Sequence, residues 1–60
     1  MPYFKVYRDR ADEYRWQLVA ANGEIMAVSE GYTSKQNAMY SASRLWEVAR
    51  DARVIDEIAA

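Results

Sequence analysis

Apolar and polar residues alternate along the first half of the chain, and this period of two predicts β-strands. The alternation covers residues 3–9 and then residues 13–29, where the pair Asn22-Gly23 interrupts it. Asn followed by Gly is typical of a two-residue type I′ turn, because both central residues of that turn need a positive φ. The pattern therefore predicts three antiparallel strands in series, with a tight turn between the second and the third.

The two predicted turns set the register of these strands. A three-residue loop over residues 10–12 places Val6 opposite Trp16, and Phe4 then lies opposite Leu18. The two-residue turn places Ala20 opposite Ile25, Val19 opposite Met26, Leu18 opposite Ala27 and Gln17 opposite Val28. On this register, the side chains expected on the core face are Phe4, Val6, Trp16, Leu18, Ala20, Ile25 and Ala27.

Residues 35–52 contain no Gly or Pro and change to a period of 3.6, which predicts an α-helix. Either Ser34 or Thr33 can be its N-cap, and Thr33 with Gln36 fits a capping box. The face expected against the sheet is made of mostly small residues: Ala38, Ser41, Ala42, Leu45, Val48, Ala49 and Ala52. Met39 and Trp46 lie at its edge, where they can pack on the sheet rim or mediate self-association.

Residues 53–58 hold three apolar side chains, Val54, Ile55 and Ile58, that a continued helix would turn toward water. A break near Ala52 followed by a short fourth strand suits them better. The predicted fold class is therefore α+β, in the order β-β-β-α-β, an antiparallel sheet with one helix on one face. The fourth strand can pair with its own sheet or with that of another chain.

Sixty residues make one small domain, covering 1–60, and a chain of this size is marginal as a lone monomer. The sequence has no Cys and no His, which excludes disulfides and the common zinc sites. A partner chain is then the remaining way to enlarge the core. We expect a homodimer in which residues 53–58 cross to the other subunit, with Trp46, Val54, Ile55 and Ile58 as its contacts and with no cofactor.

The net charge of −1 argues against a general polyanion binder. No apolar run approaches the roughly 20 residues of a membrane span, and the N-terminus lacks the apolar core of a signal peptide. A cytoplasmic protein without a membrane partner is the expectation.

The chain resembles the YegP-like family of small uncharacterised proteins, and the resemblance covers nearly all of it. Its matching segments are Phe4-Lys5-Val6-Tyr7, Glu13-Tyr14-Arg15-Trp16-Gln17-Leu18, Asn22-Gly23-Glu24-Ile25, Glu30-Gly31-Tyr32 and Asp51-Ala52. The resemblance implies a β3-α-β unit that occurs twice, as a tandem repeat or as two subunits, with exchange of the C-terminal strands. It implies no agreed activity. This chain departs from the family pattern at Ser41-Ala42 and at Val48-Ala49-Arg50.

Reactive groups for catalysis are scarce. Without His or Cys, a hydroxyl nucleophile would need a Lys as its base, and Ser34 and Lys35 are adjacent rather than facing across a pocket. No Gly-rich phosphate loop is present. The sequence predicts a small non-enzymatic interaction or accessory module.

An alternative function lies on the outer face of the sheet. Aromatic and cationic side chains alternate there, as in nucleic-acid stacking platforms: Tyr3, Lys5, Tyr7, Arg15 and Gln17. The same pairs also stabilise a sheet without any ligand. Nucleic-acid binding and contact with another protein are therefore both open at this face.

Overall fold

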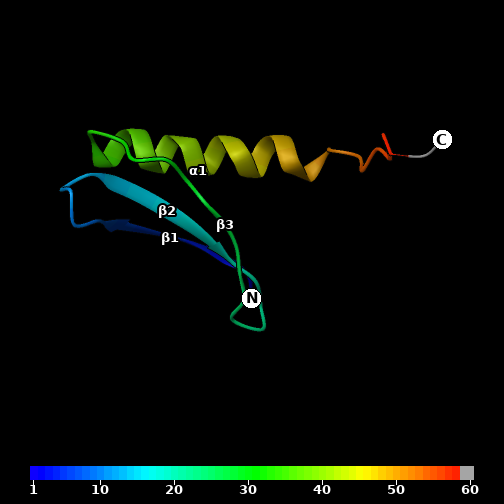
Figure 1. Ribbon diagram of the computed structural model, residues 1–60, viewed down its shortest axis with the longest axis horizontal. Coiled ribbons are helices and arrows are strands. Elements are labelled where there is room, and N and C mark those ends of the chain that lie inside the picture. Colours follow the sequence, from blue (N-terminus) through cyan, green and yellow to red (C-terminus); the bar gives the residue numbers. More distant parts are fainter. Residues whose placement is uncertain (59–60) are drawn as a thin grey trace.

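Three antiparallel strands and one helix make up the fold of the computed structural model, which describes residues 1–58 (Figure 1). The strands are β1 (Tyr3–Arg8), β2 (Tyr14–Val19) and β3 (Ile25–Val28), and the helix is α1 (Lys35–Arg50). The sheet order is β1-β2-β3, and α1 packs on β2 and β1. The predicted α+β class, with the helix on one face of an antiparallel sheet, is confirmed. Between residues 1 and 58 no helix has the length and apolarity needed to cross a membrane.

The first hairpin has the predicted register. Val6 pairs with Trp16, and Phe4 pairs with Leu18. The loop between them closes with the Asp9 N–H donating to the Glu13 carbonyl at 2.8 Å and the Asp12 N–H donating to the Asp9 carbonyl at 3.1 Å. Asp12 takes a positive φ of 67°, which an Asp tolerates better than most residues.

The predicted type I′ turn at Asn22-Gly23 is wrong, because the second hairpin repeats the loop geometry of the first. The Ala20 N–H donates to the Glu24 carbonyl, and the Gly23 N–H donates to the Ala20 carbonyl. Only Gly23 has a positive φ, at 90°, so the loop has three residues rather than two. The Asn22 side chain instead accepts a hydrogen bond from the Glu24 N–H at 3.0 Å.

The longer loop changes which face Ile25 occupies. Val19 now pairs with Ile25, while Leu18 still pairs with Ala27, so Met26 is an extra residue in β3 and forms a bulge. Opposed residues share a face, so Ile25 joins Val19 on the outer face and leaves the core face where it was expected. Val19 is buried there, only 5% exposed, and pairs with Tyr3 on its other side.

Ser34 is the N-cap of α1, and its Oγ accepts from the Asn37 N–H at 3.1 Å. The capping box expected for Thr33 and Gln36 is therefore not formed. The helix ends at Arg50, two residues before the predicted end, with Asp51 as its C-cap.

The buried core of this single chain is small. Among residues 1–58 the buried apolar residues are Trp16, Val19, Ala38 and Ala42, and no large side chain there is fully buried. Figure 1 shows why: the strands lie close to the N-terminal half of α1 and diverge from its C-terminal half. Of the expected helix face, Val48, Ala49 and Ala52 are consequently exposed.

Residues 53–58 form no strand within their own chain, so of the two pairings open to the predicted fourth strand, the one with its own sheet is not formed. The segment, here called the tail, continues beyond the end of α1 and away from the sheet (Figure 1). Val54, Ile55 and Ile58 are all exposed along it. The radius of gyration is 13.6 Å, compared with about 10 Å for a compact chain of this length.

Candidate functional site

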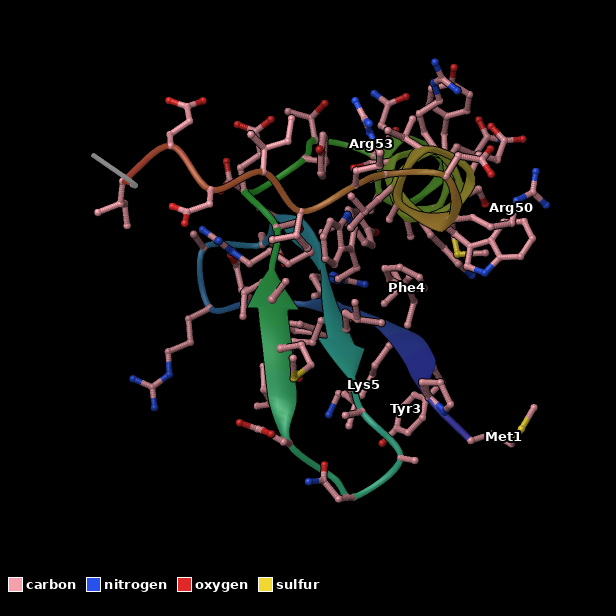
Figure 2. All side chains as sticks on the ribbon, turned by 90° about the vertical axis from the view of Figure 1, so that its right-hand side faces the viewer. Met1, Tyr3, Phe4, Lys5, Arg50 and Arg53 are labelled. Atoms are coloured by element: carbon pink, nitrogen blue, oxygen red, sulfur yellow. The ribbon has the colours of Figure 1, made fainter. Side chains whose placement is uncertain are left out.

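The structure gathers the five residues of the predicted outer face on the side of the sheet away from α1. Lys5 pairs with Gln17 and Tyr7 pairs with Arg15 across β1 and β2. Figure 2 shows Tyr3 and Lys5 on this side, whereas Phe4 points toward the helix. Tyr3 and Lys5 are exposed and the other three are half-buried.

Arg15, the central cation of that face, is already bound within the chain. Its Nε donates to Asp9 Oδ2 at 2.6 Å, and its Nη1 donates to the Ser29 carbonyl at 2.9 Å. The Arg15 guanidinium holds the pKa of Asp9 below its ordinary value, helped by the Glu13 N–H that donates to the same carboxylate. Arg15 therefore ties the β1–β2 loop to the residue that follows β3.

Asp9 organises the loop through its other carboxylate oxygen. Oδ1 accepts from the Ala11 N–H and the Glu13 N–H, both at 2.9 Å. The loop acids are thus used for structure, and among residues 1–58 no three His, Cys, Asp or Glu side chains come together in a way that could hold a metal ion. Ser34, the candidate nucleophile, is occupied as the helix cap.

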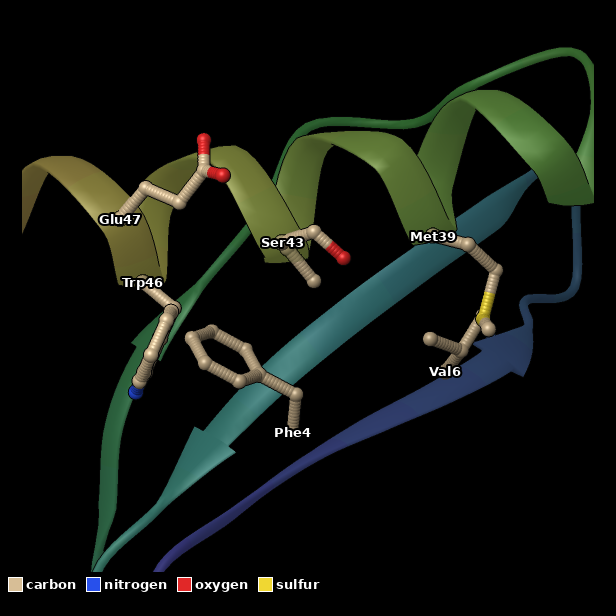
Figure 3. Close-up of a pocket in the computed structure, with 7 residues that line it drawn as sticks. Phe4, Val6, Met39, Ser43, Trp46 and Glu47 are labelled. Atoms are coloured by element: carbon tan, nitrogen blue, oxygen red, sulfur yellow. The ribbon is translucent and has the colours of Figure 1, made fainter.

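Two apolar grooves flank α1 on its sheet side. The first, here called the β1 groove, has a volume of about 450 Å³ and is lined by Phe4, Val6, Met39, Ala42, Ser43, Trp46 and Glu47. In Figure 3, Phe4 points toward Trp46 and Met39 lies over Val6. Trp46 remains 55% exposed although the Arg50 guanidinium lies 5.0 Å from its ring centroid. The sheet of the same chain therefore does not cover the Trp46 ring.

The second groove, here called the β2 groove, has a volume of about 570 Å³ and lies on the other flank of α1. Its lining is Trp16, Tyr32, Asn37, Tyr40, Ser41, Arg44, Leu45 and Val48. The Ser41 hydroxyl lines this groove and accepts two hydrogen bonds, from the Trp16 Nε1–H at 3.0 Å and from the Tyr32 hydroxyl at 2.8 Å. One signal of this role was visible in the sequence, because a Ser inside an apolar helical stripe needs a hydrogen-bond partner when buried.

Comparison with known proteins places the chain in a family. Residues 9–56 match the family described as a domain of unknown function, DUF1508. A UPF0339 protein of Neisseria meningitidis serogroup B is 56% identical over 43 residues, which are 72% of this chain and 77% of that protein. A solution NMR structure of a protein from Haloferax volcanii superposes with a TM-score of 0.79 at 46% identity, covering 92% of this chain and 93% of the other.

One relative is much longer than this chain. A UPF0339 protein of Stutzerimonas stutzeri is 35% identical over 48 residues, which are 80% of this chain but only 43% of that protein. None of these names states an activity. The resemblance to YegP-like proteins is thereby confirmed, and the chain belongs to this uncharacterised DUF1508 family, which includes the UPF0339 proteins.

Proposed function

We propose that the chain acts as a non-enzymatic interaction module that is built as a homodimer, in which each tail completes the sheet of the other copy. The observation that carries this proposal is the tail itself. Val54 and Ile58 are almost fully exposed and Ile55 is 67% exposed, at the end of a chain with very few buried side chains. Three apolar residues in six, held away from their own sheet, suit a segment that another chain covers.

The exposed area supports the same proposal. A compact monomer of 7.0 kDa exposes about 4,000 Å², whereas this chain exposes 5237 Å². The excess of about 1,200 Å² exceeds the roughly 800 Å² that each partner buries in a standard interface. The long Stutzerimonas stutzeri relative adds a further argument, since the match leaves more than half of that protein for a second unit.

The non-enzymatic part of the proposal rests on the side chains present. The chain has no His or Cys, its candidate hydroxyl is a helix cap, and the Asp9 carboxylate is tied to Arg15 and to the loop backbone. These groups stabilise the fold and leave no base positioned beside a nucleophile. A cytoplasmic location stays a prediction, to be checked by cell fractionation.

The test is the mass in solution of the intact chain and of a version that ends at Ala52, measured at the same concentration. We expect the intact chain to be a dimer of about twice 7.0 kDa and the shortened chain to be monomeric or unfolded. A matched pair of tail variants sharpens the comparison. Replacing Val54, Ile55 and Ile58 with Ser should dissociate the dimer, whereas replacing Arg53 with Ser should not.

Folded monomers of both the intact and the shortened chain would contradict the proposal. In that case the tail would not be part of the fold, and its three apolar residues would mark a docking segment for a different protein.

A further inference from the structure

The edge of α1 beside the β1 groove carries an apolar stripe that neither the sheet nor the tail of its own chain covers. Met39 is 49% exposed and Trp46 is 55% exposed, and both line the β1 groove. Ser43, a small exposed residue, lies between them. At about 100° per residue, these three side chains fall within about 60° of one another on the helix surface. They form one narrow face with a small centre and two large ends (Figure 3).

This face has the arrangement that a two-fold axis requires. In an isologous contact, a residue on one side of the axis meets a residue at the same distance on the other side. Met39 lies four positions before Ser43 and Trp46 lies three positions after it. In an antiparallel pair of helices, Met39 of one copy can therefore meet Trp46 of the other copy. Small residues at the centre of a helix crossing let the two helices approach closely, and a methionine sulfur packs favourably against an aromatic ring.

We infer that the α1 helices of two copies pack side by side and antiparallel, with Ser43 near the two-fold axis and Met39 against the partner's Trp46. This inference rests on the proposed homodimer and names the surface that holds it together. A second copy of this chain is the partner that suits this face. The accessible surface exceeds that of a compact monomer by about 1,200 Å² per chain, enough for the interface of a stable dimer, and the face is complementary to itself.

The direction of the tail selects the antiparallel arrangement. Each tail leaves the end of α1 and points away from its own sheet (Figure 1). Lys35 and Asp51 both lie about 12 Å from Ser43 along the helix, so an antiparallel partner brings its C-cap level with Lys35. The sheet is closest to α1 at that end. A parallel pair would instead send both tails beyond both sheets.

Charge at that end agrees with an incoming tail. A hollow of about 300 Å³ is lined there by Val6, Tyr7, Arg8, Tyr14 and Lys35. It combines two cations with apolar and aromatic surface, and the tail combines Asp56 and Glu57 with three apolar residues.

Met39 and Trp46 also lie on the side of Ser43 nearer to the buried Ala42, which faces the sheet. The two sheets of the dimer therefore come to lie on the same side of the helix pair.

Single cysteines test the inference, because the chain contains none of its own. Ser43→Cys places a thiol near the axis, where facing Cα atoms of two packed helices are about 4–6 Å apart, within reach of a disulfide. Gln36→Cys places an exposed thiol on the same face, about 10 Å further along each helix. The helical content and the solution mass of both variants are measured under reducing conditions. Both are then oxidised, and the fraction of covalent dimer is measured in the absence of reductant.

We expect both reduced variants to be folded dimers, and Ser43→Cys alone to become a covalent dimer, at least ten times faster than Gln36→Cys. Equal cross-linking of both would indicate parallel helices and overturn the inference. A Ser43→Cys variant that is a dimer but does not cross-link would also overturn the inference. The proposed homodimer would stand in that case. If both reduced variants and the unmodified chain are folded monomers, the proposed homodimer fails and the helix pairing fails with it.

Discussion

The indole Nε1 of Trp16 donates a hydrogen bond to the Oγ of Ser41 at 3.0 Å, which fixes α1 on the centre of the sheet. Trp16 is buried and its ring meets Phe4 edge to face, with centroids 5.3 Å apart. The Tyr32 hydroxyl donates to the same Ser41 oxygen. One small hydroxyl thus joins the helix, the central strand and the segment that leads into the helix.

Replacing Ser41 with Ala should therefore destabilise the fold. The buried indole N–H loses its acceptor, which costs about 1–3 kcal/mol, or a fall in Tm of roughly 4–8 °C for each kcal/mol in a domain of this size. Thermal unfolding at one fixed protein concentration measures the loss. Asn37→Ala is the matched control, because Asn37 is exposed on the same helix, outside the face formed by Met39, Ser43 and Trp46, and Ala is the better helix former. An equal Tm for the two variants would contradict this account.

The Asp9–Arg15 pair predicts a stability that depends on pH. Arg15 lowers the pKa of Asp9 in the folded chain, so the ionised carboxylate stabilises the fold at any pH above its unfolded pKa of about 4. That contribution is lost as the pH falls through the lower, folded pKa. We expect the urea midpoint of the natural chain to fall over this acidic range.

Asp9→Asn should lower the midpoint at pH 7 and flatten its dependence on pH below 4. Arg15→Gln should flatten it as well, since it removes the main cause of the lowered pKa. An Asp9→Asn variant whose midpoint follows the natural chain at every pH would show that the pair does not contribute.

The three-residue loop between β2 and β3 predicts unequal effects at neighbouring positions. A Cβ at Gly23 would meet nothing within 4 Å, so Gly23→Ala is opposed only by the positive φ, at about 1–2 kcal/mol. Asn22 has a negative φ and loses only one exposed hydrogen bond on change to Ala, which we expect to cost less than about 1 kcal/mol. Equal losses from the two substitutions, measured by urea unfolding, would instead indicate a type I′ turn.

The outer sheet face predicts weak or no binding of nucleic acid. Arg15 is neutralised by Asp9, which leaves Lys5 as the remaining cation among the five residues of that face. A labelled single-stranded oligonucleotide should show no mobility shift with the chain at low salt. A shift that weakens with added salt and disappears in Lys5→Gln, but not in Arg53→Gln, would revive the alternative function.

The register of the first hairpin followed from the sequence because alternation and loop length agreed on a single pairing of Val6 with Trp16. The second hairpin did not, since Asn22-Gly23 is compatible with loops of two or three residues. The two loops differ by one residue, and in a strand one residue reverses the face. Ile25 therefore moved to the outer face, although Leu18 and Ala27 kept their predicted pairing.

From the amino-acid sequence alone, two hairpins, a helix with Ser34 or Thr33 as its N-cap and an apolar segment after that helix could be predicted. These follow from local periodicity and capping, which act over a few residues. The folded structure was needed to show that Ser41 accepts a hydrogen bond from Trp16, that Arg15 pairs with Asp9, and that the strands diverge from the C-terminal half of α1 (Figure 1). These relationships depend on how helix and sheet pack and on how the β1–β2 loop closes, and residues apart in the chain determine both together.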